Sequence, residues 1–282
     1  MLDFQLFRIK VYSAGQKNLF EKDKSRSEVL DEVINSLPSA ELRTNIIWHI
    51  GNIAKIDATG LYFRIGRTSP STLELFKDGN FMEQNFETAP YTHVLLDTKL
   101  EVCAIANRTK VSPTVSGIAN QFIQLLNKSG KASHFVVKFE ADKINDPDDF
   151  IGHIQKAYAI SKFWITFKKP NPFDANEDFV KPYQKLLQEI HGEKGKSELM
   201  GDQLKPDVVE NLARSAASTG DDASALIQVS QKGKKTRKYL KGNPVIIQHD
   251  DISDNDQKKT FLERIREVYF RIRGKEDETN EL

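Results

Sequence analysis

Hydrophobic and polar positions alternate most clearly between residues 134 and 172, and the pattern predicts a strand, a helix and a second strand. Between the two strands, apolar residues recur at helical spacing from Phe150 to Tyr158. Asp146 and Pro147 are the residue types of an N-cap and a first helical position. The stretch therefore predicts a β-α-β unit, with its strands over 134–140 and 163–168.

Upstream, the alternation of apolar and charged residues predicts a first strand over 4–12, with an apolar side and a cationic side. Ser25 and Glu28 have capping-box spacing, so a helix is expected over 27–37 with Leu37 at the end of its apolar stripe. After this helix, apolar residues again recur at every second position, which predicts an antiparallel meander. Its strands are expected over 46–56, 61–66, 93–96 and 101–106, and the segment 76–90 is expected to cover the sheet.

Ser112 and Pro113 are expected to open the next helix, and the polar segment 128–133 is the best candidate for a boundary. Residues 192–202 have the composition of a mobile segment. These features predict an α+β fold in two subdomains, 1–130 and 131–275, followed by an acidic disordered tail over 276–282. The second subdomain is expected to hold helices over 177–191, 206–217 and 256–273, and short strands over 225–230 and 244–248.

Composition narrows the class of protein. Hydrophobic residues make up 39% of the 282 positions, which is enough for a core, and charged residues make up 29%. No apolar run reaches the roughly 18 residues that span a bilayer. The first residues lack the basic and apolar regions of a signal peptide. Cys103 is the only cysteine, so an internal disulfide and a structural cysteine–zinc site are excluded. We expect a cytoplasmic protein without a cofactor.

The net charge of +1 hides a basic segment between the last two short strands. It holds six cations and no acid, and the expected final helix carries further cations beside its apolar stripe. Such a run is typical of surfaces that contact phosphate, because each neutralised phosphate releases counterions. A solvated hairpin is the simpler alternative. The predicted nucleic-acid-binding residues are Lys232, Lys234, Lys235, Arg237, Lys238, Tyr239, Lys241, Lys258, Lys259, Arg264, Arg266, Arg271 and Arg273.

Two acidic groups are candidates for metal sites. Asp97, Glu140 and Asp142 could serve a metal-dependent nuclease, but the expected Glu-x-Lys pair is missing and carboxylates at strand ends are common for solubility. The second group is Asp146, Asp148, Asp149 and His153, whose acids a capped helix start already explains. We therefore assign no metal site.

Other chemistry-bearing residues have ordinary explanations. Cys103 lies within an apolar strand and is expected to be a core filler. The segment 192–197 partly matches a phosphate-binding loop, but Ile190 stands where that motif needs glycine. Trp48 and Trp164 point away from the aliphatic sides of their strands, so each lies either under a helix, which we favour, or on a partner surface.

Three hypotheses of function remain. The first is a non-enzymatic nucleic-acid-binding or accessory protein, of the kind found in antiviral or mobile-element loci. The second is an interaction subunit that binds a protein partner or another copy of itself. The third is a metal-dependent nuclease. The sequence does not choose between DNA and RNA.

Overall fold

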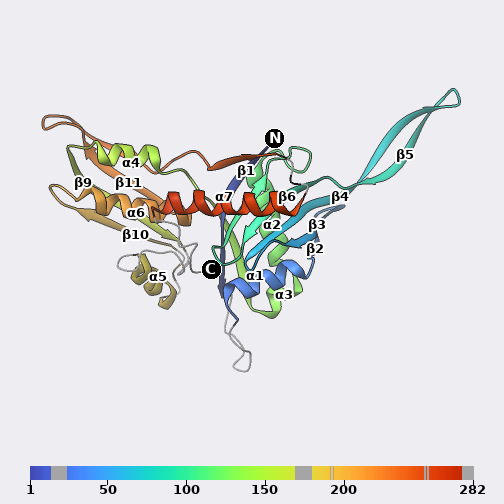
Figure 1. The fold of residues 1–282 in the computed structure, drawn as a ribbon, viewed down its shortest axis with the longest axis horizontal. Helices are drawn as coiled ribbons and strands as arrows, with labels where there is room; N and C mark the ends of the chain where they lie inside the picture. The colour runs from blue at the N-terminus through green and yellow to red at the C-terminus, as the bar shows by residue number, and fades with distance from the viewer. Residues whose placement is uncertain are drawn as a thin grey trace. The chain divides into compact units, whose positions relative to one another are not determined.

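A computed structural model describes residues 1–13, 24–168, 180–190, 192, 194–250, 252 and 254–274 (Figure 1). It confirms the α+β class with an N-terminal antiparallel meander, and these residues form 13 strands and seven helices. The predicted tail over 276–282 lies outside the described residues. Among the helices of the described part, none is both long and apolar enough to cross a lipid bilayer.

The chain forms two compact units, and each draws on separate segments. Unit 1 comprises Met1–Gln5, Ser13–Ala141 and Gln248–Leu262, and unit 2 comprises Leu6–Tyr12, Asp142–Ile247 and Glu263–Leu282. The strand β1 (Leu2–Ser13) and the helix α7 (Asn255–Arg273) therefore contribute residues to both units. The predicted division near residue 130 stays a prediction.

Antiparallel strands form the meander of unit 1, as the alternating pattern predicts. Neighbouring strands follow the order β7-β6-β4-β3-β2, and β5 pairs with β4 outside that path. The path continues beyond β7 to β1, which also pairs with β8 (Val137–Lys143) and β13 (Ile246–His249). The bounds of the meander strands are β2 Ser39–Arg43, β3 Ile46–Lys55, β4 Gly60–Lys77, β5 Asn80–Thr88, β6 Tyr91–Asp97 and β7 Val102–Ala106.

The helix α1 (Arg26–Asn35) has the predicted capping box. The Glu28 amide donates to Ser25 Oγ at 3.2 Å, and the Ser25 amide donates to the Glu28 carboxylate at 2.7 Å. Hydrogen bonds from the Ser25 side chain and from the Ser25 amide lower the pKa of the Glu28 carboxyl. The expectation for Leu37 was wrong, because it lies past the helix end with a φ of 51° and its side chain is 54% exposed.

The helix α2 differs from the prediction at its start, and the helix α3 was not predicted. The helix α2 (Val115–Asn127) buries the expected stripe, but it begins after Thr114, whose side chain accepts from the Gly117 amide. Ser112 and Pro113 therefore precede the cap. The expected boundary segment 128–133 contains most of a short helix, α3 (Gly130–His134), and Ser129 Oγ caps this helix by accepting from the Ala132 amide.

The segment 76–90 does not cover the sheet, which contradicts the prediction. Residues up to Lys77 extend β4, and β5 pairs with this extension. The two strands form a hairpin that projects away from the rest of the unit (Figure 1). Asp78 and Gly79 form the turn with φ values of 52° and 80°, the left-handed conformation that favours Gly and Asp in tight hairpins. The side chain of Phe81 is 87% exposed, so its hydrophobicity does not mark a core position.

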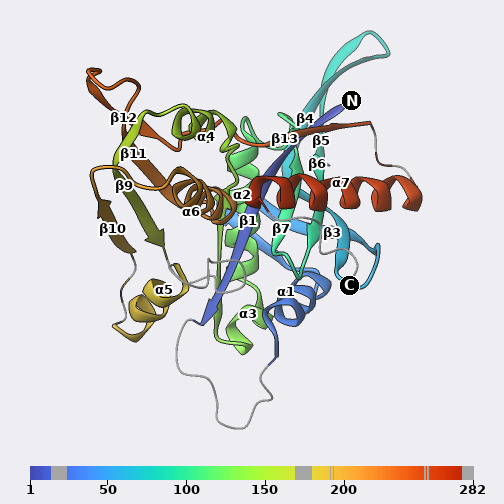
Figure 2. The ribbon, with the colours of Figure 1, turned by 60° about the vertical axis from the view of Figure 1, so that its left-hand side comes forward.

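Unit 2 is built on a four-stranded antiparallel sheet with the order β10-β9-β11-β12. Phe163, Ile165 and Ala225 are buried on one face, and α4 and α6 pack against that side (Figure 2). Residues 192–202 were predicted to be mobile, but most of them form β10. The bounds are β9 Ala159–Lys168, β10 Lys194–Met200, β11 Asp222–Gln228, β12 Lys235–Tyr239, α4 Asp148–Gln155, α5 Val180–Glu189 and α6 Pro206–Thr219.

The predicted strand, helix and strand are present as β8, α4 and β9, but the two strands belong to different sheets. They therefore do not form a β-α-β unit within one sheet. The first strand begins three residues later than predicted, because Phe135 is the C-cap of α3. Asp146 Oδ1 accepts from the Asp148 amide at 2.9 Å, so it supports the helix start, although Pro147 is the N-cap.

The cationic side of β1 is buried, which the alternating pattern did not predict. The side chains of Arg8 and Lys10 are 0% and 1% exposed. Lys10 Nζ lies 2.8 Å from Asp142 Oδ2 and 3.7 Å from Asp221 Oδ1, and Arg8 donates to the Tyr269 hydroxyl at 2.7 Å. Paired charges of this kind can be buried because each partner compensates the desolvation of the other.

Candidate nucleic-acid interface

One row of side chains crosses the sheet of unit 2 on the face opposite its buried core. The strand registers place Glu198, Trp164, Ser224 and Tyr239 side by side on β10, β9, β11 and β12. Directly opposed residues in antiparallel strands project to the same face. No helix among the described residues covers these positions, and the Tyr239 side chain is 50% exposed. The row therefore forms an open face with aromatic side chains.

Arg237 links this row. Its guanidinium carbon lies 4.0 Å from the centre of the Trp164 ring and 5.1 Å from that of Tyr239. Its Nε and Nη2 atoms donate to Ser224 Oγ at 3.2 and 2.9 Å. The guanidinium thus lies close to two aromatic rings, and the Arg237 side chain remains exposed.

Further cations surround the row and border a groove of about 590 Å³. Lys194 and Lys196 line it from β10, and Lys241 lines it from the segment after β12. Lys241 Nζ lies 5.1 Å from the centre of the Tyr239 ring. Among the described residues that line the groove, Asp222 is the single acid. The groove is therefore strongly cationic.

Glu198 is the second carboxylate on this face, and it is paired. Its Oε1 atom lies 2.9 Å from Lys162 Nζ. Hydrogen bonds from Lys162 and from Trp164 lower the pKa of Glu198. At neutral pH the carboxylate is ionised, so it neutralises Lys162 and opposes the binding of an anion.

The structure divides the predicted basic segment between several places. Lys235, Arg237, Tyr239 and Lys241 lie on the open face or at its edge. Lys238 is opposite Ala225 and projects to the other face of β12. Lys232 and Lys234 are exposed in the turn between β11 and β12.

The predicted cations of α7 are divided between the two units. Lys258 and Lys259 belong to unit 1. In unit 2, Arg266 is buried, Arg273 lies in the last turn of α7, and Arg264 and Arg271 line a pocket that also holds Asp146, Asp148 and Asp149.

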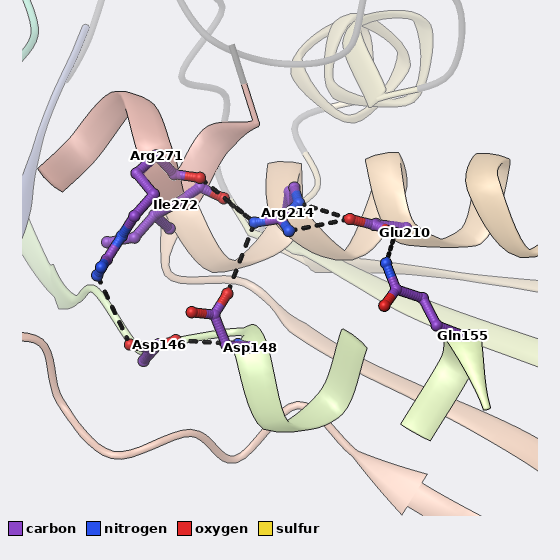
Figure 3. A network of polar contacts seen from close by, with 7 residues as sticks. All are labelled: Asp146, Asp148, Gln155, Glu210, Arg214, Arg271 and Ile272. Carbon is purple, nitrogen blue, oxygen red and sulfur yellow. Dashed lines mark hydrogen bonds and ion pairs between the residues drawn. The ribbon is translucent and has the colours of Figure 1, made fainter. Parts of the chain in front are cut away.

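An ion-pair network accounts for the second acidic group (Figure 3). Arg271 lies 3.9 Å from Asp146, and Arg214 lies 3.8 Å from Asp148. Arg214 also pairs with Glu210 at 2.9 Å and donates to the Arg271 and Ile272 carbonyl groups near the end of α7. The acids at the start of α4 thus fix two arginines, and His153 lies 4.0 Å from Asp149.

The carboxylates of the nuclease hypothesis have other partners. Asp97 is buried, and its two oxygens accept from the Leu100 amide at 2.8 Å and from Thr59 Oγ1 at 3.0 Å. Asp142 pairs with Lys10 and belongs to unit 2, whereas Asp97 and Glu140 belong to unit 1. Across the described residues, no group of three or more metal-ligating side chains converges.

The other residues with candidate chemistry lie in strands. Burial raises the pKa of the Cys103 thiol. Residues 194–197 lie in β10 and form a strand. Trp48 is 4% exposed and lines a pocket with residues of α2, whereas Trp164 lies on the open face.

Sequence reasoning missed Lys162, Lys194 and Lys196 as members of the interface. Lys162 alternates with the apolar residues of β9, so its face could have been inferred, but the pairing of β10 with β9 could not. Comparison of the sequence with protein-family models and with curated proteins finds no match to either.

Proposed function

We propose that this protein is a non-enzymatic nucleic-acid-binding protein that holds a single strand across the open face of the unit 2 sheet. The observation that carries the proposal is the cluster of Trp164, Arg237 and Tyr239, which is surrounded by lysines. Aromatic and guanidinium planes on an exposed sheet stack with unpaired bases, and nearby cations neutralise the backbone. A duplex hides the faces of its bases, so a single strand fits this surface better.

The cations predict binding that depends on charge and little on sequence. Phosphates of the strand would meet Lys194, Lys196, Lys235 and Lys241, while Arg237 and Tyr239 contact bases. Such contacts release counterions and carry little sequence information.

Fluorescence anisotropy with a labelled single strand and a labelled duplex tests the proposal. The face variant combines Lys196→Gln, Lys235→Gln and Lys241→Gln. The expected result is a single-strand affinity for the wild type that is higher than its duplex affinity and that falls strongly in the face variant.

The basic segment supplies a matched control. Combining Lys232→Gln, Lys234→Gln and Lys238→Gln removes the same number of charges from the turn and from the other face of β12. This variant should retain most of the single-strand affinity. Equal losses in the two variants would show that net charge alone drives binding, and the proposal would then be wrong.

A further inference from the structure

Unit 1 contains a second cationic site, a pocket of about 780 Å³. It is lined by residues of β3, β4 and β6, the segment after β7 and the first turns of α7, all of which belong to this unit. Its polar lining residues include Tyr62, Arg64, Tyr91, His93, Arg108 and Lys258.

Tyrosine rings hold the three cations in place. Arg64 and Arg108 lie over the Tyr91 ring, with guanidinium carbons 4.4 and 5.1 Å from its centre. Lys258 Nζ lies 4.8 Å from the centre of the Tyr62 ring. Cation–π contacts fix the positions of these groups.

Hydrogen bonds organise the floor of the pocket. The Tyr62 hydroxyl lies 2.8 Å from His93 Nδ1, and Arg64 Nε donates to the same hydroxyl at 3.2 Å. Tyr62 and His93 are both buried, at 4% exposure each. Arg64 is therefore hydrogen-bonded to a buried polar pair, Tyr62 and His93.

None of the described residues that line this pocket is acidic. Arg108 and Lys258 form no ion pair within the described chain. Three cations around one concave site produce a positive potential that favours an anion. Ile53, Ala54 and Ile252 add apolar lining, and the volume is many times the roughly 30 Å³ that one water occupies in the liquid.

We infer that this pocket binds a small organic phosphate monoester, with the phosphate at Arg64, Arg108 and Lys258 and the organic part against the apolar lining. Arginine and lysine are the residues that recognise phosphate groups most often. The inference is independent of the nucleic-acid proposal, because it concerns different residues in the other unit.

Calorimetric titration with AMP, inorganic phosphate and adenosine tests the inference. AMP should bind, inorganic phosphate should bind more weakly, and adenosine should give no measurable heat of binding. The double variant Arg108→Gln and Lys258→Gln should bind AMP about tenfold more weakly or worse, as expected for lost charge-assisted hydrogen bonds.

Exposed lysines near the pocket give the control. Lys55 follows Ala54, and Lys110 lies two residues after Arg108, but neither lines the pocket. The double variant Lys55→Gln and Lys110→Gln should bind AMP like the wild type. Absence of AMP binding in the wild type, equal losses in both double variants, or phosphate binding as tight as AMP binding would each overturn the inference.

A separate observation concerns the β4–β5 hairpin, whose outer strand pairs only with β4 in the described chain. The cross-strand register gives its two faces different characters. Leu73, Leu75, Met82 and Phe86 share one face, and three of these four side chains are more than 40% exposed. Edge strands of this kind are templates for pairing with another strand.

The sequence of β5 is compatible with pairing to a second copy of itself. A twofold axis through Gln84 uses the whole strand and places Met82 opposite Phe86 of the other copy. It also places Glu83 opposite Asn85 and Glu87 opposite Phe81. Shifting the register by two residues in either direction opposes carboxylates, either Glu83 with itself or Glu83 with Glu87, and opposed like charges are unfavourable.

We propose that two copies of the chain associate through antiparallel pairing of their β5 strands in this register. The apolar faces of the two hairpins then form one four-stranded apolar surface. This gives the interaction-subunit hypothesis a specific form, a homodimer, and it stands or falls independently of nucleic-acid binding.

Sedimentation velocity over a wide range of protein concentration measures the association. Asn85→Glu should weaken it, because each substituted side chain then faces Glu83 of the other copy. Asn85→Lys should strengthen it for the opposite reason. Within the hairpin, Asn85 is opposite Thr72, so Thr72→Glu is a charge control that should leave association unchanged. A wild type that stays monomeric, or two Asn85 variants that shift association in the same direction, would contradict the proposal.

Discussion

Salt dependence gives the sharpest quantitative expectation for the open face of unit 2. Six cations belong to it: Lys162, Lys194, Lys196, Lys235, Arg237 and Lys241. Lys162 is paired with Glu198 and Arg237 is assigned to bases, which leaves about four lysines that can each neutralise a phosphate. For a single strand the logarithm of affinity falls by about 0.7 per phosphate for each tenfold rise in salt, so the expected slope is about −2.8.

Removing three of these cations should change the slope in proportion. The face variant, with Lys196, Lys235 and Lys241 each changed to Gln, retains about one contact, so its expected slope is about −0.7. If the two proteins bind equally at 1 M salt, the variant should bind about a hundredfold more weakly at 0.1 M. Anisotropy titrations at several salt concentrations measure both slopes. Parallel lines for the wild type and the variant would refute the assignment of these lysines to phosphate contacts.

Three further predictions follow from individual side chains. Glu198→Gln should tighten single-strand binding at neutral pH, because it frees Lys162 from its carboxylate partner. Since the pKa of Glu198 is lowered, the affinity of the wild type should approach that of the variant only as the pH falls below the usual range of a glutamate. Lys10→Met should lower the free energy of unfolding by about 3 kcal/mol in denaturant titrations, because it leaves Asp221 buried without this cation. Adding Asp221→Asn to the same chain should restore part of the lost stability. Phe81→Ser should change the free energy of unfolding by less than about 0.5 kcal/mol, and a larger loss would mean that the hairpin tip is buried.

Local patterns predicted the elements whose causes are local. The capping box of Ser25 and Glu28 and the apolar stripe of α2 depend on residues a few positions apart, so the sequence was sufficient for them. The same local reasoning failed for the segment 76–90, because an apolar residue such as Phe81 can be buried or can belong to an exposed hairpin. It failed for Lys10, because both faces of β1 are covered by elements distant in the chain.

The interface was predicted only in part for a related reason. The charge run identified Lys235, Arg237, Tyr239 and Lys241, which lie close together in the sequence. Trp164 joins them because β11 lies between β9 and β12, and that pairing is set by strand register. The places of the cations from Lys232 to Lys238, in the turn or on one of the two faces of β12, likewise depend on the residue at which β12 begins.

The most direct test of the central claim is the fluorescence of Trp164 during binding of a single strand. Trp48 is the only other tryptophan and it belongs to unit 1, so Trp48→Phe leaves one reporter on the open face. We predict that an unlabelled single strand changes the intensity or wavelength of that emission, with a midpoint that matches the anisotropy titration. Binding that is seen by anisotropy but leaves the Trp164 emission unchanged would contradict the account and place the nucleic acid elsewhere on the protein.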